Sequence, residues 1–310
     1  MEYSIIKRFR KGHFVDHVKE QVHCRDAFLM GLTGKGVGVA VLDTGIFPHK
    51  DFDERIIGFA DMVNRRAGPY DDCGHGSHIC GIIGGSGVVS DGRYQGMAPG
   101  CNLVAVKVLN QKGNGYVADV LAGVDWVLER KDVLGVRILN ISVGAGGRKK
   151  ISENSALVRG VNRAWDAGLV VVVAAGNNGP RCMSVTTPGI SRKVITVGCS
   201  DDDREVLVGG KKMVDYSGRG PTVECICKPD LVAPGCRVVS CAAARNQYAI
   251  KSGTSMSTPI VSGAIALLLE KYPEMTNRDV KLKLRESCRD IGLPRNQQGW
   301  GILDMERLLL

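Results

Sequence analysis

Hydrophobic and polar positions follow two patterns along this chain. Short, uninterrupted apolar runs recur between longer stretches whose apolar positions return every three or four residues. The apolar runs predict strands at 37–42, 103–109, 138–143, 169–174 and 194–198, and the longer stretches predict helices at 76–84, 117–130, 155–167 and 260–269. Because strands and helices alternate, the pattern predicts an α/β fold with a mostly parallel central sheet and helices on both of its faces.

Composition narrows the class of protein. The chain has 310 residues, of which 44% are hydrophobic, and its formal net charge is +9. No apolar stretch reaches the roughly 18 residues of a membrane span, so we expect no membrane partner. Basic residues cluster only at 7–11 and 148–150 and are not interleaved with aromatic residues, so we expect a solvated basic surface and no nucleic-acid partner.

A hydroxyl-rich segment stands directly before the apolar helix predicted at 260–269. Residues 252–259 read Ser-Gly-Thr-Ser-Met-Ser-Thr-Pro. Near a helix start, Ser255 would have the positive end of the helix dipole beside it and a backbone N–H without an intrahelical partner. Those are conditions for a nucleophile whose own N–H helps to stabilise an oxyanion. The same residue types are also ordinary helix caps, so this segment alone leaves both interpretations open.

Two further segments supply an acid and a base. The strand predicted at 37–42 is followed by Asp43, at the carboxyl edge where parallel sheets place their chemistry. His75 stands between two glycines at a predicted helix start. Asp43 could instead form an Asx turn, and His75 could be a turn histidine with its hydrogen bonds satisfied. The order acid, base and nucleophile, each in a glycine-rich setting, favours the functional interpretation.

Together these segments resemble the subtilases, which are subtilisin-like serine proteases. The resemblance is carried by residues 41–45, 74–78, 174–179 and 253–259, covers the chain from about residue 30 onward, and is closest in style to intracellular bacterial subtilisins. The order Asp, His, Ser is the one that subtilisin itself exemplifies. The resemblance implies a three-layer αβα subtilisin-like fold, with a short N-terminal extension at 1–27 and a peptidase domain at 28–310.

The resemblance also implies roles for single residues in a serine endopeptidase. Ser255 would be the nucleophile, His75 the general base and Asp43 its orienting partner. Asn177 would donate to the oxyanion. The implied substrate-binding residues are Ser142, Val143, Gly144, Ala175, Gly176, Asn178, Thr186 and Thr254. Asn178 and Thr186 are uncharged, which predicts an apolar or aromatic P1 residue rather than lysine or arginine.

Cofactor predictions are sparse. The chemistry requires no cofactor. Asp51 matches a calcium-ligand position of the family, but residues 84–97 lack the family's asparagine-rich calcium turn, so a structural calcium stays unassigned. Cys225, Cys227, Cys236 and Cys241 could suggest zinc, yet the segment between them resembles a family strand and loop that carries its ends apart. We therefore expect no zinc site from these four residues.

The chain start and the cysteines bear on location. Residues 1–10 are followed by no apolar core of a secretory signal. The chain has 11 cysteines, an odd number, which favours reduced thiols and a cytoplasmic protein.

Three roles remain: a general endopeptidase acting on proteins or peptides, a dedicated leader peptidase, and a catalytically silent regulatory binding protein. Intact Asp43, His75, Asn177 and Ser255 argue against the third, and the sequence indicates no oligomeric state.

Overall fold

The computed structural model of the protein describes residues 17–144 and 152–310, and two predictions fall outside them. The segment at 1–10 and the basic clusters at 7–11 and 148–150 are among the residues not described. In the described part, the centre is a seven-stranded sheet in the order β2-β3-β1-β4-β5-β6-β9. Its strands are β1 (Gly38–Asp43), β2 (Ile56–Asp61), β3 (Asn102–Lys107), β4 (Val136–Ile141), β5 (Val170–Ala174), β6 (Ile195–Cys199) and β9 (Leu231–Ala233).

All neighbouring strands of this sheet are parallel. Strands β1 and β5 are buried at every position. A strand covered on both faces needs apolar side chains on both, which explains why these strands appear in the sequence as continuous apolar runs. Because the strands are parallel, their carboxyl ends lie along one edge, where Asp43 and the residues following β4 and β5 gather.

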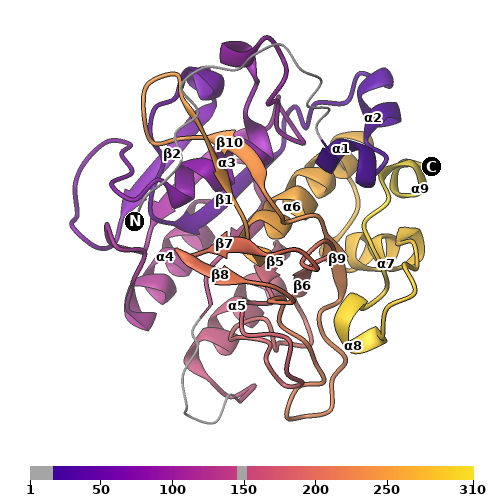
Figure 1. Cartoon of the computed structure of the whole chain (residues 1–310). Coiled ribbons are helices and arrows are strands. Elements are labelled where there is room, and N and C mark those ends of the chain that lie inside the picture. Colours follow the sequence, from indigo (N-terminus) through magenta and orange to yellow (C-terminus); the bar gives the residue numbers. More distant parts are fainter. Residues whose placement is uncertain (1–16, 145–151) are drawn as a thin grey trace.

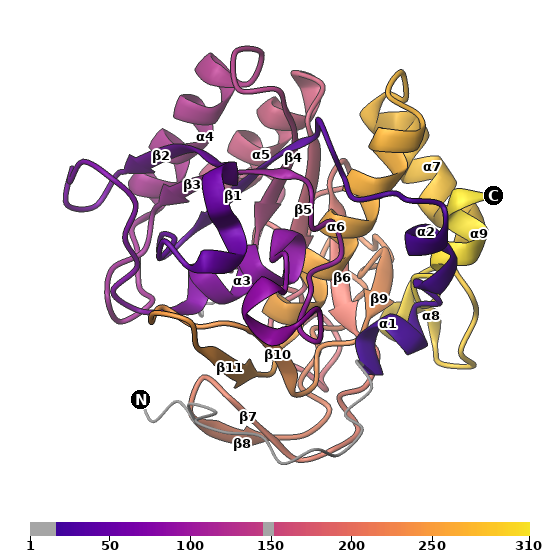
Figure 2. The ribbon, with the colours of Figure 1, turned by 90° about the horizontal axis from the view of Figure 1, so that it is seen from above.

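Helices cover both faces of the sheet, as predicted (Figures 1 and 2). On one face lie α3 (His75–Gly84) and α6 (Thr254–Lys271), and on the other α4 (Val117–Arg130) and α5 (Ala156–Asp166). The three-layer α/β prediction is therefore confirmed. Helix α6 begins six residues earlier than the apolar run at 260–269 indicated, so Ser255 lies within its first turn. The helix is buried on nearly every side, which a helix apolar all round requires.

The remaining elements lie outside the central layers. Antiparallel pairs are formed by β7 (Val206–Val208) with β8 (Lys211–Met213) and by β10 (Val238–Cys241) with β11 (Tyr248–Lys251). The 3-10 turns are η1 (Lys50–Arg55) and η2 (Val88–Ser90), and the C-terminal helices are α7 (Asn277–Ser287), α8 (Arg295–Gln298) and α9 (Met305–Leu309). None of the helices in the described ranges is long and apolar enough to cross a membrane.

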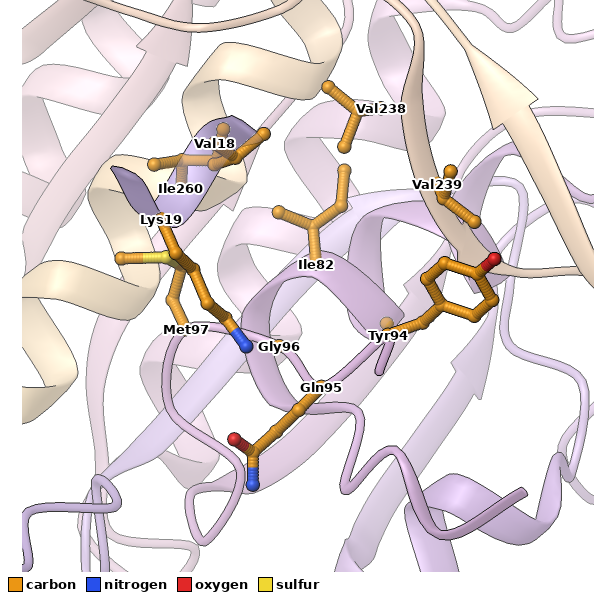
Figure 3. Close-up of a pocket in the computed structure, with 11 residues that line it drawn as sticks. Val18, Lys19, Ile82, Tyr94, Gln95, Gly96, Met97, Val238, Val239 and Ile260 are labelled. Carbon is orange, nitrogen blue, oxygen red and sulfur yellow. The ribbon is translucent and has the colours of Figure 1, made fainter. Parts of the chain in front are cut away.

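Two short helices, α1 (His17–Gln21) and α2 (Arg25–Leu29), pack against the rest of the chain. Val18, Val22 and Ala27 belong to the main hydrophobic core, and the Met305 N–H donates to the Val22 carbonyl at 2.8 Å. A small cavity between α1, α3 and β10 is lined by Val18, Ile82, Val238 and neighbours (Figure 3). Its volume of about 20 Å³ is room for a water molecule and not for a substrate side chain. The domain boundary after residue 27 stays a prediction.

Candidate active site

The acid and the base are in direct contact. Asp43 is the last residue of β1 and His75 the first of α3. Asp43 Oδ1 lies 2.7 Å from His75 Nδ1, and the Thr44 N–H donates to the same oxygen at 2.8 Å. The Asp43 side chain is 1% exposed and that of His75 24%. Because the carboxylate accepts at Nδ1, the neutral imidazole carries its proton there and leaves a lone pair on Nε2.

Close backbone approach fixes the start of α3 against the end of β1. A Cβ at Gly76 would lie 2.1 Å from the Gly45 carbonyl oxygen, so only glycine fits there. The Gly76 N–H also donates to Thr44 Oγ1 at 2.8 Å. The glycines around His75 thus allow the turn after Asp43 to touch the first turn of α3.

Asp71 is a buried carboxylate that ties this region together. It accepts from Thr44 Oγ1 at 2.8 Å, from the Gly74 N–H at 2.7 Å and from Ser77 Oγ at 2.7 Å. Burial alone would raise the pKa of Asp71, but the hydrogen bonds from Ser77, Gly74 and Cys73 outweigh it and lower that pKa. A lowered carboxyl pKa contributes stability above the unfolded value, and this contribution is lost as the pH falls through the folded value.

Lys107, on the neighbouring strand β3, holds the turn that follows Asp43. It pairs in register with Asp43 and is fully buried. Its Nζ donates to the carbonyls of Thr44 and Leu109, both at 2.8 Å, and to Asp72 Oδ1 at 2.6 Å. Sequence reasoning missed this residue. The available signal was a single charge within the apolar run at 103–109.

The motif at 74–78 contains a second histidine, and the structure separates the two. His78 is fully buried, and its Nε2 donates to the carbonyls of Val238 and Ala249 at 3.2 and 3.1 Å. Burial, with the nearby charges of Lys251 and His75, holds the pKa of His78 well below its usual value. His78 therefore stays neutral in the core, and His75 is the histidine that solvent reaches.

The candidate nucleophile, Ser255, is hydrogen-bonded to a backbone carbonyl and not to His75 in this structure. Ser255 is the second residue of α6, and its Oγ donates to the Ser142 carbonyl at 2.8 Å. Among the hydrogen bonds of the described residues, none joins Ser255 to His75. Such bonds are often long or absent without substrate and form in the complex. Ser142 is itself held, because its Oγ accepts from Asn140 Nδ2 at 3.0 Å.

Asn177 lies beside the start of α6 and is fixed through its oxygen. Its Oδ1 accepts from the Thr254 N–H at 3.0 Å and from Thr254 Oγ1 at 3.1 Å. Thr254 Oγ1 also accepts from the Gly176 N–H at 3.2 Å. With Oδ1 committed to Thr254, Asn177 Nδ2 is the group left to donate to a bound molecule.

The predicted substrate-binding residues follow two adjacent strands. Ser142, Val143 and Gly144 come after β4, and Ala175 and Gly176 after β5. Thr186 reaches both segments, since a Cβ at Gly144 or at Gly176 would lie 2.3 or 2.4 Å from Thr186 Oγ1. Thr186 is therefore packed against both strand ends, whereas Asn178 is exposed.

The four cysteines considered for zinc do not gather. Cys225 and Cys227 are exposed, while Cys236 and Cys241 belong to different core clusters. No disulfide joins any of the eleven cysteines, all of which fall within the described residues. Cys241 instead lies with His49 and Asp51, a grouping that the sequence reasoning missed because it depends on tertiary contact.

The fold and the site together define a class, the subtilisin-like serine proteases. An acid, a histidine and a serine at a helix start gather at the carboxyl edge of a parallel sheet, with an amide side chain beside them. Residues 34–301 match the sequence profile of the Subtilase family, and the chain belongs to that family.

Individual relatives agree with the family assignment. The chain is 43% identical over 290 residues to serine protease AprX of Bacillus subtilis (strain 168), an alignment covering 87% of this chain and 66% of that protein. It is 34% identical over 276 residues to subtilisin Savinase of Lederbergia lenta, covering 89% of this chain and 91% of the relative. A crystal structure of a cold-adapted subtilisin-like serine proteinase superposes with a TM-score of 0.72 at 30% identity, covering 88% of this chain and 90% of the other.

Proposed function

We propose that the protein is a serine endopeptidase that hydrolyses peptide bonds through Asp43, His75 and Ser255. The observation that carries the proposal is the 2.7 Å contact between Asp43 Oδ1 and His75 Nδ1, which leaves the Nε2 lone pair to accept a proton. Family membership supports the same chemistry.

The proposed reaction assigns one task to each group. Ser255 Oγ attacks the substrate carbonyl carbon while its proton passes to His75 Nε2. Asn177 Nδ2 and the Ser255 N–H donate to the oxyanion that forms. As the C–N bond breaks, His75 gives the proton to the leaving amine, and water then hydrolyses the acyl-enzyme by the same route. Asp43 stays ionised and stabilises the imidazolium.

The bond from Ser255 Oγ to the Ser142 carbonyl must break before this reaction. A substrate pairing as an added strand with residues 142–144 and 175–176 would crowd this carbonyl. Rotation of the Ser255 side chain then brings its hydroxyl to His75. Substrate binding thus completes the alignment of the nucleophile in this proposal.

We propose an uncharged P1 residue, apolar or aromatic, because Asn178 and Thr186 place no carboxylate in the primary pocket. The contact of Thr186 with the positions of Gly144 and Gly176 would set the depth of that pocket. Cleavage-site mass spectrometry on a peptide library should show apolar and aromatic P1 residues ahead of lysine and arginine. A profile dominated by basic P1 would contradict this preference.

A graded series tests the role of Thr186. Thr186→Gly should shift the P1 profile toward the largest side chains, on the order of tenfold in the ratio of kcat/KM values, because one or two missing groups in a pocket change binding by about 1–3 kcal/mol. Thr186→Ser keeps the hydroxyl and should give a smaller shift. An unchanged profile in both variants would remove Thr186 from the pocket.

The biological setting is part of the proposal. The chain spans 66% of the length of AprX, so the activity of that whole protein is not carried over directly. We place the protein in the cytoplasm, supported by the exposed thiols of Cys182, Cys225 and Cys227, which an oxidising compartment would modify. Its partners would be protein or peptide substrates. Broad cleavage of a cell extract would support a general endopeptidase, and cleavage of one short motif a dedicated leader peptidase.

A further inference from the structure

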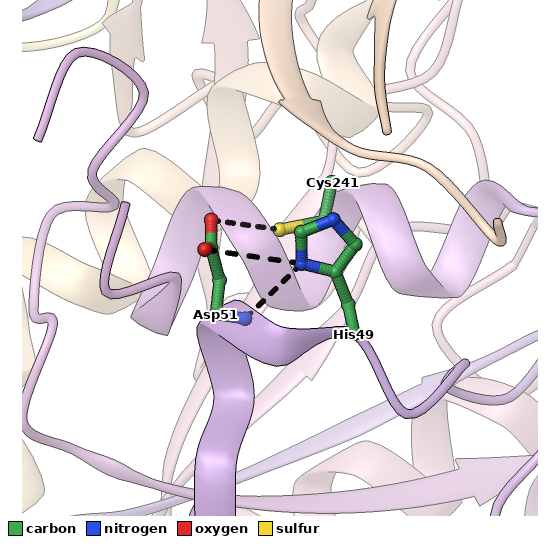
Figure 4. Close-up of side chains that lie close together, drawn as sticks. All are labelled: His49, Asp51 and Cys241. Atoms are coloured by element: carbon green, nitrogen blue, oxygen red, sulfur yellow. Dashed lines mark hydrogen bonds and ion pairs between the residues drawn. The ribbon is translucent and has the colours of Figure 1, made fainter. Parts of the chain in front are cut away.

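His49, Asp51 and Cys241 form a fully buried cluster outside the catalytic residues (Figure 4). Each offers one donor atom, and the three atoms lie within 4.8 Å of one another. The side chains of His49 and Asp51 are 0% exposed, and Cys241 is likewise buried. An imidazole, a carboxylate and a thiol buried together are the ligand types of zinc sites.

The imidazole has the tautomer that a metal ligand through Nδ1 needs. His49 Nε2 lies 3.1 Å from the Gln247 carbonyl, which can only accept, so Nε2 carries the proton. Nδ1 therefore holds the lone pair. In this structure it accepts from the Asp51 N–H at 3.1 Å, a hydrogen bond that a metal ion would replace (Figure 4). A ligating histidine almost always donates its other N–H to a carbonyl or carboxylate in this way.

The carboxylate is held by partners that would form an outer shell. Asp51 Oδ1 accepts from the Val89 N–H at 3.0 Å, and Asp51 Oδ2 accepts from the Tyr248 hydroxyl at 2.6 Å. Cys241 Sγ lies 3.7 Å from Asp51 Oδ2. These contacts fix both carboxylate oxygens beside the thiol and the imidazole.

Calcium does not fit this cluster, although Asp51 matches a calcium-ligand position of the family. Calcium takes six to eight oxygen ligands. Of the three side chains in the cluster, only Asp51 offers oxygen. The two other donors, nitrogen and sulfur, are ligands that zinc prefers and calcium does not.

The ligand spacing is close to that of tetrahedral zinc for the sulfur and wider for the nitrogen. Ordinary Zn–S, Zn–N and Zn–O bonds place a sulfur about 3.5 Å and a nitrogen about 3.3 Å from a carboxylate oxygen in the same tetrahedron. The structure has 3.7 Å from Cys241 Sγ to Asp51 Oδ2 and 3.9 Å from His49 Nδ1 to Asp51 Oδ1. The two distances run to different oxygens of the carboxylate. Binding through one oxygen would need the carboxylate to turn and the nitrogen to come about 0.6 Å closer.

We propose that His49, Asp51 and Cys241 bind one Zn²⁺ ion, with a water molecule as the fourth ligand and the Cys241 thiol releasing its proton on binding. The ion would join η1, six to eight residues after Asp43, to the β10–β11 hairpin, which leads directly to Ser255. It would therefore tie together the segments bearing the acid and the nucleophile.

Cobalt binding tests the site without relying on activity. The full chain carries Ser255→Ala to prevent self-digestion and serine at Cys182, Cys225 and Cys227 to remove exposed thiols. One equivalent of Co²⁺ should give thiolate-to-cobalt charge-transfer absorption and the intense visible bands of tetrahedral cobalt, and Zn²⁺ should abolish both. Cys241→Ser should lose the charge-transfer band, and His49→Gln should weaken cobalt binding at least tenfold, as loss of a ligand or its orienting shell does.

Cys101→Ala is the matched control, because it removes another buried thiol and should keep the cobalt spectrum. Zn²⁺ should also raise the Tm of the parent and of Cys101→Ala but not of Cys241→Ser, since a ligand that binds only the folded state stabilises it. Absence of a charge-transfer band in folded protein with reduced Cys241, or a band that persists in folded Cys241→Ser, would overturn the proposal. Stabilisation by Ca²⁺ alone would also overturn it.

Discussion

The two halves of the candidate triad are held in different ways. The acid and the base are joined by a 2.7 Å bond and braced by buried groups, among them Asp71 and Lys107. The nucleophile rests on a backbone carbonyl, 2.8 Å from the Ser142 oxygen. The acid stands at the end of β1 and the base at the start of α3. The nucleophile stands at the start of α6.

The fold alone fixes the orientation of His75, whereas substrate binding is proposed to complete the alignment of Ser255. The orientation of His75 depends on internal hydrogen bonds that persist without substrate. The Ser255 hydroxyl has one rotation to make, and its present acceptor belongs to the segment where substrate is proposed to pair. Changes in the first half should therefore affect turnover and stability together, whereas changes near Ser255 should affect turnover alone.

The largest expected effect comes from breaking the acid–base half. His75→Ala should lower kcat on the order of 10⁶-fold, the loss that subtilisin itself shows. Asp43→Asn should lower kcat on the order of 10⁴-fold, because the amide no longer holds the histidine in the correct tautomer. Initial rates on a chromogenic peptide measure both, with the exposed His23→Ala as control. Turnover in His75→Ala within about tenfold of the parent would contradict the assigned base.

Substitutions of Asn177 test whether its amide nitrogen donates to the oxyanion. Asn177→Ala should lower kcat by about 10²–10³-fold with little change in KM, because its bond forms to the oxyanion, as for the equivalent subtilisin donor. Asn177→Asp keeps an oxygen for Thr254 and removes the donor, so it should be as impaired. An aspartate variant with parental kcat would show that Asn177 acts only as a tether.

A reagent at Cys73 should disturb the acid–base half from outside. Cys73 is half-buried, two residues before His75, and its N–H donates to Asp71 Oδ1 at 3.0 Å. A bulky mercurial there should lower kcat by up to about 100-fold by shifting the imidazole. Cys73→Ser should stay active and resist the reagent. Cys80 is fully buried, and burial raises the pKa of its thiol well above the usual value, so Cys80→Ala should leave the sensitivity unchanged.

Full sensitivity in the Cys73→Ser, Cys80→Ala double variant would place the reactive thiol elsewhere. Loss of activity in Cys73→Ser under reducing conditions would give the cysteine a direct role that the triad does not explain.

Lys107 should show the smallest kinetic effect and a clear effect on stability. Lys107→Met leaves two buried carbonyls without their donor and should lower the free energy of unfolding by about 3 kcal/mol. Displacement of the turn after Asp43 should lower kcat about tenfold with KM unchanged, measured well below the Tm. The exposed Lys112→Met is the control. A lower Tm with parental kcat would make Lys107 purely structural.

The sequence predicted the central sheet well because its strands are buried on both faces. Val170 to Val173 can be read as a strand from hydrophobicity alone, and the helices between the strands keep their amphipathic spacing. The strand β2 was missed, because it lies at the sheet edge, is half-buried, and shows no continuous apolar run.

The candidate site was predictable only where residues carry a local motif. Asp43, His75, Asn177 and Ser255 stand in glycine-rich segments whose order resembles a family. Lys107 has no such motif, since its role comes from strand register. Cys241 and Asp51 are 190 residues apart, and their contact arises only when the β10–β11 hairpin packs on η1. The rotamer of Ser255 likewise depends on a tertiary contact, the hydrogen bond to the Ser142 carbonyl.

Ser255 is proposed to be the nucleophile that His75 activates. A serine-directed fluorophosphonate followed by peptide mass spectrometry tests it most directly. We expect one adduct on Ser255, strongly reduced in His75→Ala and absent in Ser255→Ala. An adduct on another residue, or labelling that persists in folded Ser255→Ala, would contradict it.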